Sequence, residues 1–179
     1  MNIVIKPGVD LSSDELNQIK EALFREFKYL LPPRNQLGNR LFFLLIDKAK
    51  ILSMGALKKV KPVIFNGEEF SLLGFVSVVA NEKGKGYGKQ VVMAMRDYLT
   101  SNNISGIGFT MPKNRGFYEK CGFSIEVSST QRFVYKKGNE NITNQDGQVI
   151  FYLDSSDRFM EKVLANPSET AFIPTDKLW

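Results

Sequence analysis

A glycine-rich segment, Lys83-Gly84-Lys85-Gly86-Tyr87-Gly88, is the part of this chain whose residue types and spacing point most directly to chemistry. It follows an apolar run, residues 72–79, and precedes a helical pattern that begins at Lys89. Glycines let a backbone approach a ligand closely, and a helix that begins here aims its unpaired N–H groups and the positive end of its dipole at the same place. With the charges of Lys83, Lys85 and Lys89, this arrangement predicts a phosphate-binding loop.

The residues of this segment exclude two common phosphate loops. A nucleoside-triphosphate loop requires Gly, four residues and then Gly-Lys-Ser/Thr, but Gly88-Lys89 is followed by Gln90, and the position five before Gly88 is Lys83. A dinucleotide fingerprint requires Gly-x-Gly-x-x-Gly, but Lys89 or Val91 stands where the last glycine belongs. The simpler alternative is a glycine-rich surface turn whose lysines contribute to solubility.

The composition narrows the chemistry further. With 179 residues, of which 43% are hydrophobic, the chain is long enough for one domain with its own core. It contains no histidine, which excludes a Ser-His-Asp triad, a Cys-His pair and most catalytic zinc sites, and we expect no metal. The net charge of +5 favours an anionic partner, and a polyanionic cofactor explains that charge with fewer assumptions than nucleic acid does.

Three features favour a cytoplasmic location. No apolar run approaches the ~20 residues that a membrane span needs, so we expect no membrane partner. The first residues, 1–8, have the pattern of a short strand and turn and not that of a signal peptide. A single cysteine cannot form an internal disulfide and is compatible with a reducing compartment.

The hydrophobic periodicity predicts an α+β fold with one parallel crossover beside the glycine loop. Ser12 and Glu15 match a capping box at the start of the first helix, and Asn66-Gly67 is a strong hairpin signal. Residues 138–147 have the pattern of a polar loop, and the end of the chain that of an irregular tail. The predicted helices cover residues 10–30, 89–100, 116–121 and 155–164, and the predicted strands cover residues 40–46, 51–58, 62–65, 70–79, 104–111, 131–136 and 148–153.

A second motif, Phe117-Tyr118-Glu119-Lys120-Cys121-Gly122-Phe123, lies downstream of the glycine loop. Taken with Lys83, Gly86 and Gly88, it resembles the GNAT acetyltransferase superfamily, whose members carry a basic residue or glutamine, two spacers and Gly-x-Gly, and then a Phe/Leu-Tyr-x-x-x-Gly-Phe box. The resemblance covers residues 1–137 and leaves residues 138–179 as a C-terminal extension, which we expect to pack on the same domain. It implies the acyl-CoA N-acyltransferase fold, a mixed, mostly antiparallel central sheet of about six or seven strands flanked by helices.

The resemblance also implies that acetyl-CoA is bound as a co-substrate. The pyrophosphate would lie on backbone N–H groups of the glycine loop, and the pantetheine arm would pair like an extra strand with the main chain of the preceding strand. That pairing requires this strand to splay from its neighbour after Val78, which a β-bulge would allow. The residues implied in cofactor binding are Val76, Ser77, Val78, Lys83, Gly84, Lys85, Gly86, Tyr87, Gly88, Lys89 and Asn114.

By the same resemblance, Tyr118 is the general acid that protonates the CoA thiolate as it leaves. A phenol of pKa about 10 is well matched to a thiolate leaving group of pKa about 8.5 or higher. The alternative is that Tyr118 only packs in a short helix. Cys121 lies in the same box. Because the chain contains no histidine that could activate its thiol, we expect Cys121 to pack and not to act as a nucleophile.

The general base is not assigned. Some relatives place a glutamate on the strand before the loop, but the matching position here is Leu72. Glu68 and Glu69 stand at a predicted hairpin turn, and Asp154 and Asp157 in the extension are further candidates. Many relatives use a chain of waters, or accept an amine that arrives neutral.

The resemblance therefore implies an N-acetyltransferase that moves an acetyl group directly to a primary amine in a ternary complex, with a backbone N–H near Val78 stabilising the oxyanion. Two alternatives stay open: a non-catalytic acyl-CoA-binding or sensing module, and a basic nucleic-acid-binding domain, which is less favoured because most aromatic residues fall in apolar patterns. The apolar residues of the extension could line the acceptor site or form a homodimer contact. The sequence does not identify the acceptor.

Overall fold

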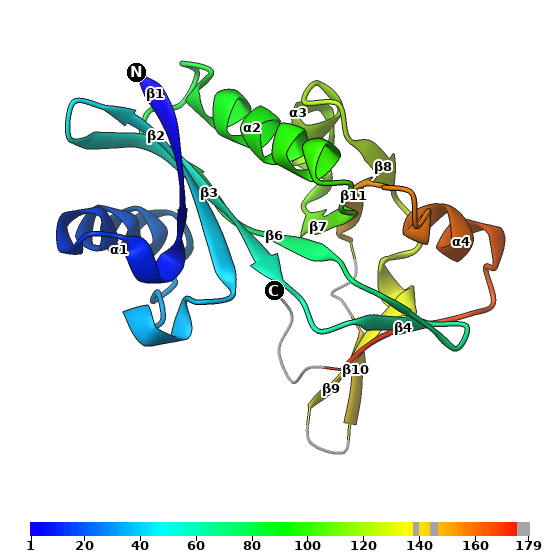
Figure 1. The fold of residues 1–179 in the computed structure, drawn as a ribbon. Helices are drawn as coiled ribbons and strands as arrows, with labels where there is room; N and C mark the ends of the chain where they lie inside the picture. Colours follow the sequence, from blue (N-terminus) through cyan, green and yellow to red (C-terminus); the bar gives the residue numbers. More distant parts are fainter. Residues whose placement is uncertain (138–139, 144–146, 175–179) are drawn as a thin grey trace. The chain divides into compact units, whose positions relative to one another are not determined.

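Two units make up the chain, and each has its own apolar core. The computed structural model describes residues 1–137, 140–143 and 147–174. Unit 1 consists of Met1–Lys58 and Phe75–Met95, and unit 2 consists of Lys59–Gly74 and the described residues from Arg96 onward (Figure 1). The α+β class and the mixed sheets predicted from the sequence are confirmed.

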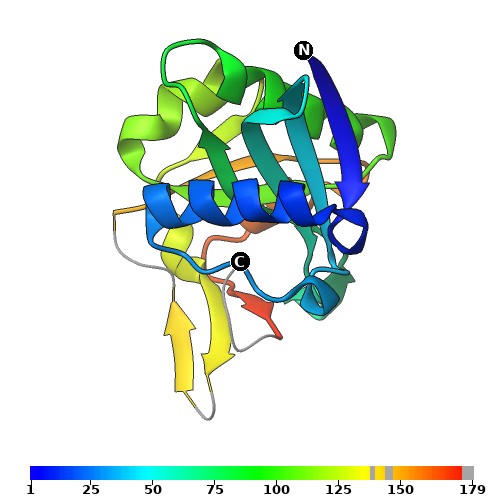
Figure 2. The same ribbon diagram turned by 90° about the vertical axis from the view of Figure 1, so that its left-hand side faces the viewer.

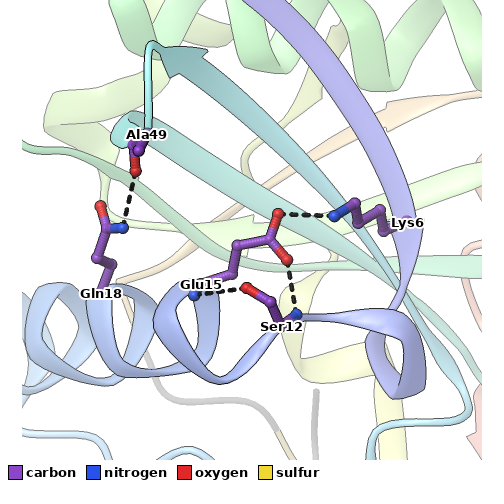
Figure 3. Close-up of polar contacts among 5 residues, drawn as sticks. All are labelled: Lys6, Ser12, Glu15, Gln18 and Ala49. Carbon is purple, nitrogen blue, oxygen red and sulfur yellow. Dashed lines mark hydrogen bonds and ion pairs between the residues drawn. The ribbon is translucent and has the colours of Figure 1, made fainter.

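The first helix of unit 1, α1 (Ser13–Phe27), begins at the predicted capping box. The Ser12 hydroxyl accepts from the Glu15 N–H, and the Glu15 carboxylate accepts from the Ser12 N–H at 2.7 Å (Figure 3). Lys6 reaches the same carboxylate at 2.7 Å. Burial disfavours the charged form of Glu15, but the hydrogen bonds from Lys6 and Ser12 outweigh it and hold its pKa below the usual range. The N-terminus of α1 is therefore tied to Lys6 of the strand β1 (Asn2–Pro7).

Gln18 ties the second turn of α1 to a hairpin. Its side-chain amide donates to the carbonyl of Ala49 (Figure 3). Its side-chain oxygen accepts from the N–H of Ile51 at 2.8 Å. Figure 2 shows α1 lying across one face of the unit 1 strands. Leu16, Ile19 and Leu23 on that side of the helix are buried, as the helical spacing predicted. The same spacing placed Phe24 and Phe27 in the core, and this part of the prediction is wrong, because both side chains are about half exposed.

The sheet of unit 1 has the hydrogen-bonded order β1 (Asn2–Pro7), β2 (Arg40–Asp47), β3 (Lys50–Lys59) and β6 (Leu73–Ala80). Phe42 and Leu44 share the face that packs on α1. The first turns of α2 (Tyr87–Ser101) cover the other face, where a Cβ at Gly55 would lie 2.7 Å from the sulfur of Met95. Helices on both faces make this a sheet buried on two sides.

Unit 2 contains the parallel strand pairing that the predicted crossover requires. Leu73 and Gly74 of β6 pair in parallel with Gly106 and Ile107 of β7 (Gly106–Thr110), as predicted. On the other side of β7 lies β11 (Val149–Leu153), which also pairs with β8 (Ser124–Glu126). The strand predicted in the C-terminal extension is therefore hydrogen-bonded on both edges. The boundary between residues 137 and 138 stays a prediction.

A second sheet and a helix complete unit 2. The strand order is β10 (Glu140–Thr143), β9 (Phe133–Lys137), β12 (Ala171–Ile173), β4 (Val63–Phe65) and β5 (Glu68–Phe70). Helix α4 (Phe159–Ala165) contributes Phe159, Met160 and Val163 to its core. The remaining short elements are α3 (Arg115–Glu119) and single 3-10 turns at Gly8–Asp10, Arg34–Gln36, Pro112–Asn114 and Thr130–Arg132.

The predicted hairpin at Asn66-Gly67 is confirmed, since both residues have positive φ, 52° and 79°. The strand predicted over 70–79 is wrong as one element: β5 ends at Phe70 in the second sheet, and β6 begins at Leu73. Phe70 and Leu72 both enter the unit 2 core, and the Leu72 carbonyl accepts from the Val60 N–H. The chain therefore changes sheets between them.

Three further predictions are corrected at the C-terminal side. Residues 138–147 were predicted as a loop, but Glu140–Thr143 form β10, whose mostly polar side chains suit an edge strand. The rest of that prediction, at residues 138–139 and 144–146, lies outside the described residues. The tail contains β12, which pairs with β9 and β4. The helix predicted from residue 155 begins at Phe159, because the Asp154 carboxylate accepts the N–H groups of Met160 and Glu161.

The capping box gives a direct test of this fold. We expect Ser12→Ala to lower the free energy of unfolding by about 1 kcal/mol, because the Glu15 N–H loses its acceptor. Urea unfolding followed by circular dichroism measures the change. Ser13→Ala is the matched control: Ser13 is already inside the helix, and we expect a change within about 0.5 kcal/mol. Equal losses in both variants would contradict the assigned cap.

Candidate active site

The glycine loop of unit 1 adopts a conformation that requires glycine. Gly84 and Gly86 have φ of 76° and 74°, and nothing lies within 4 Å of the position that a Cβ would occupy at either residue. The segment from Glu82 to Gly86 is exposed. Other side chains rarely adopt this left-handed conformation, so the sequence pattern and the backbone agree. The open space leaves the loop backbone accessible to a ligand.

The helix after the loop begins two residues earlier than predicted, at Tyr87 instead of Lys89. Tyr87, Gly88 and Lys89 lie in the first turn of α2, and the Gln90 N–H donates to the Gly86 carbonyl at 3.2 Å. The N–H groups of those three residues precede that bond, where an α-helix forms no internal hydrogen bonds. They therefore supply the free donors at the positive end of the helix dipole that an anion-binding site needs.

Ser77 interrupts β6 before the loop. Its φ is 60°, a left-handed conformation in the middle of a strand. Val76 and Val79 both pack against the α1 core, although residues three apart point to opposite faces of a regular strand. Val78 lies instead beside the position of a Cβ on Gly55, on the α2 side. The backbone therefore has the bulge-like irregularity that the resemblance required near Val76, Ser77 and Val78.

Of the three lysines in and after the glycine loop, one forms an ion pair with a carboxylate of unit 1. The Lys83 ammonium pairs with Glu26 of α1 at 2.8 Å, and the Lys83 side chain is 68% exposed. Within the described ranges, Lys85 and Lys89 form no ion pair, and both are exposed. Asn81 anchors the start of the loop, because its N–H donates to the Leu52 carbonyl at 2.9 Å.

Tyr118 lies in α3, within unit 2, and is buried among aromatic rings. It is 8% exposed. Its ring stacks on Phe151 with centroids 3.6 Å apart and planes 13° apart, and it meets Phe123 edge-on. Burial raises the pKa of the Tyr118 hydroxyl well above its usual range, and the neighbouring Cys121 raises it further. Among the described residues, no hydrogen-bond partner of this hydroxyl is found.

The other residues singled out from the sequence near Tyr118 have local partners. Asn114 precedes α3, and its amide donates to the Thr110 hydroxyl at 2.9 Å. Cys121 is fully buried, and its carbonyl accepts from Arg96 at 3.0 Å. Both residues help to fix the turn that leads from β7 into α3.

Three of the four carboxylates considered as bases make structural contacts, and the fourth, Glu69, is exposed on β5. Glu68 pairs with Lys162 at 2.6 Å. Asp157 accepts from the Ser105 hydroxyl at 2.6 Å and from the Phe159 N–H. Asp154 caps α4, and burial, together with two nearby acidic groups, raises its pKa above the usual range despite its two backbone hydrogen bonds. Leu72 is buried in the unit 2 core.

The predicted site residues divide between the units. Unit 1 holds all the predicted cofactor residues except Asn114, and unit 2 holds Asn114 and Tyr118. Sequence reasoning missed Phe151, whose ring packs on Tyr118. The available signals were the glycines of the predicted strand 104–111 and the aromatic residues of the predicted strand 148–153, but the sequence did not show that these two strands pair. Within the described residues, no helix is long and apolar enough to span a membrane, and no cluster of His, Cys, Asp and Glu could hold a metal ion.

Comparison with protein families identifies a model of the acetyltransferase (GNAT) family that matches residues 11–123. Among curated proteins, none matches the chain.

Solved structures of similar fold include an acyl-CoA N-acyltransferase from Pseudomonas aeruginosa, with 13% identity over 85% of this chain and 99% of that chain, at a TM-score of 0.58. An acetyltransferase from Bacillus subtilis in complex with CoA has 18% identity over 86% of this chain and 97% of that chain, at 0.57. Glucosamine-6-phosphate N-acetyltransferase from Arabidopsis thaliana has 21% identity over 69% of this chain and 92% of that chain, at 0.53. At these identities the likenesses show the fold alone.

The buried tyrosine can be tested by titration. We expect Tyr118 to keep its proton at pH 11, about one unit above the usual tyrosine pKa, because its folded-state pKa is raised. The absorbance of tyrosinate at 295 nm should then be the same at pH 11 in the native wild type and in Tyr118→Phe. Since the unfolded chain ionises near pH 10 and the folded chain does not, the free energy of unfolding should fall as the pH rises above about 10.

Unfolded protein is the control for this titration. In concentrated guanidinium at pH 11, Tyr118→Phe should show less tyrosinate than the wild type, by the absorbance of a single residue. A native difference of the same size would contradict the raised pKa.

Proposed function

Because the chain belongs to the acetyltransferase (GNAT) family, we propose that it transfers an acetyl group from acetyl-CoA to a primary amine. The observation that carries the proposal is the junction of β6 and α2. Left-handed Gly84 and Gly86, with open space at both, stand beside the free N–H groups at the start of α2. Such a junction suits a pyrophosphate, because backbone donors and the helix dipole act on the same anion.

The proposed cofactor site extends along β6. The pantetheine arm carries amide groups that can pair with strand backbone, and the irregularity at Ser77 supports this role for Val76, Ser77 and Val78. Lys83, Lys85 and Lys89 add positive charge near the pyrophosphate position, and we assign Asn114 to the cofactor by resemblance alone. In this proposal the backbone supplies the shape of the site and the lysines supply charge.

Tyr118 is proposed as the general acid. The amine nitrogen forms a bond to the acetyl carbonyl carbon, the carbon–sulfur bond breaks, and the sulfur takes a proton from the Tyr118 hydroxyl. The acylated nitrogen releases one proton to solvent, and the Tyr118 phenolate takes up one proton from solvent, so the enzyme returns to its starting state. Burial keeps this hydroxyl protonated across the working pH range, which a general acid requires.

The proposal includes no carboxylate base. Glu68, Asp154 and Asp157 already accept hydrogen bonds or pair with a cation within unit 2. An amine that arrives as the free base needs no such group, and the positioning of the two substrates can supply much of the rate enhancement. The acceptor is therefore proposed as a primary amine with an appreciable neutral fraction at the working pH.

A non-catalytic acyl-CoA-binding module is the second candidate. The observation that favours it is the buried Leu72, which stands where some relatives carry a catalytic glutamate. Release of free thiol from acetyl-CoA, measured with a panel of small amines, amino acids and peptides, separates the two functions. Thiol release that depends on an amine supports the enzyme, and CoA binding without thiol release supports the module.

The cytoplasmic location and a homodimer stay predictions. The aromatic strand β11 of the extension is paired on both edges within unit 2, so it offers no free edge for pairing with a strand of a second copy. Size-exclusion chromatography with light scattering measures the assembly directly.

Removing the Tyr118 hydroxyl tests the proposed acid. We expect Tyr118→Phe to lower kcat by about 100-fold or more, because general acid catalysis contributes about 10²–10⁴-fold, while the Kd of acetyl-CoA changes less than about threefold. Steady-state kinetics and calorimetry measure the two quantities. Tyr152→Phe is the control: it removes the hydroxyl of a half-buried tyrosine in unit 2, and kcat should stay near that of the wild type. Unchanged turnover in Tyr118→Phe would remove Tyr118 from the mechanism.

A side chain in the glycine loop tests the proposed phosphate site. We expect Gly86→Glu to weaken CoA binding by more than about 100-fold, since a carboxylate would stand where the anion binds. Calorimetry measures the affinity, and circular dichroism checks the fold. Gly67→Glu is the matched control, because Gly67 has nearly the same φ, 79° against 74°, and the same open space. Normal CoA binding in a folded Gly86→Glu protein would refute the phosphate site.

A further inference from the structure

Phe151 lies directly over the backbone of a glycine. Gly108 of β7 pairs with Phe151 of β11 in the antiparallel register. A Cβ at Gly108 would lie only 2.1 Å from Cζ of Phe151 and 2.4 Å from Cε1. Real side chains do not approach so closely, so this place for the ring exists only because residue 108 is glycine. The ring is 2% exposed, which leaves it little freedom to move elsewhere.

Tyr118 is held by this ring. The two rings are nearly parallel, with centroids 3.6 Å apart. Phe123 meets both rings edge-on, at 6.3 Å from Tyr118 and 5.7 Å from Phe151. Stacked and edge-on pairs are the favoured arrangements of aromatic rings, and each is worth more than its buried area alone. Gly108, Phe123 and Phe151 together form what we term the aromatic bracket.

Packing is what orients the Tyr118 hydroxyl. Within the described part of the chain no hydrogen bond fixes this group, so its direction follows from the plane of the ring. That plane is set by the stacked Phe151 and by edge-on contacts with Phe123 and with the neighbouring Phe117 of α3, of which Phe151 is the closest ring. A reacting group that is misplaced by about 1 Å can lose about 10²-fold in rate. By orienting the ring, the aromatic bracket therefore affects the rate of any reaction that uses the hydroxyl.

We propose that Phe151, seated on Gly108, is a positioning residue that sets the orientation of Tyr118 for proton donation. The inference rests on the proposed function, because it gives Tyr118 the role of general acid. Phe151 lies outside residues 11–123, the part of the chain that matches the family model. The C-terminal segment thus acts in catalysis through Tyr118, by way of a strand that pairs with β7.

A double-mutant cycle tests the proposal. Phe151→Leu keeps an apolar side chain and removes the stacked ring, and we expect kcat to fall by about tenfold or more with the Kd of acetyl-CoA within about threefold. In a Tyr118→Phe background the same substitution should change kcat by less than about twofold, because the hydroxyl that the ring orients is already gone. Equal losses in both backgrounds, or no loss in the wild-type background, would overturn the proposal.

Two companion variants separate positioning from packing. Gly108→Ala removes neither ring but forces the Phe151 ring to shift, so it should lower kcat as Phe151→Leu does. The double variant Gly108→Ala/Phe151→Leu should have no lower kcat than Phe151→Leu alone. Phe133→Leu removes a fully buried ring from the same unit without touching Tyr118, since its ring contacts are with Phe109 and Phe159. It should lower the thermal stability and leave kcat near that of the wild type. A loss of kcat in Phe133→Leu as large as in Phe151→Leu would overturn the proposal.

A spectroscopic readout makes the test independent of the acceptor. With selectively labelled tyrosine, the ring of Tyr118 should show slow flips by NMR in the wild type and faster flips in Phe151→Leu, the signal being assigned by its loss in Tyr118→Phe. Equal flip rates would overturn the bracket and leave the proposed function standing. A normal kcat in Tyr118→Phe would overturn the general acid, and with it the catalytic role given to Phe151, whatever the flip rates.

Discussion

The left-handed backbone of Ser77 is the constraint on which the candidate cofactor site depends. A non-glycine residue with φ of 60° in the middle of a strand is disfavoured by about 1–2 kcal/mol, so other contacts must offset it. Val76 and Val79 both enter the unit 1 core, which they could not do in a regular strand. The Ser53 hydroxyl donates to the Val79 carbonyl at 2.8 Å, which ties the strand down after the irregularity. The start of the glycine loop is therefore set by the core and by β3.

Sequence reasoning succeeded where the signal is local. The capping box at Ser12, the Asn66-Gly67 turn and the left-handed Gly84 and Gly86 each follow from residue types that have few alternative conformations. The apolar stripe of α1 and the parallel crossover after β6 also follow from periodicity and order. Each of these features can be formed, or strongly favoured, by neighbours in the chain.

The rest depends on partners distant in the sequence. β12 has three residues, and it is a strand because β9 lies on one side and β4 on the other. Ser77 has no local feature that predicts a positive φ. The contact of Phe151 with Tyr118 depends on a register that places Phe151 opposite Gly108, and a shift by one residue would turn Phe151 to the other face. Long-range pairing of this kind leaves little trace in a single sequence.

The electrostatics of the glycine loop favour exchange of one anion for another. Lys83 already has a carboxylate partner, Glu26, but both side chains are partly open to solvent, at 68% and 35%. An exposed pair of this kind is worth about 0–1 kcal/mol, so an anion with several charges can replace Glu26 at little cost. Among the described residues, no carboxylate accepts a hydrogen bond from the N–H groups of Tyr87, Gly88 and Lys89 at the start of α2. Affinity for a pyrophosphate should therefore reside mainly in the backbone, and the lysines should set its dependence on ionic strength.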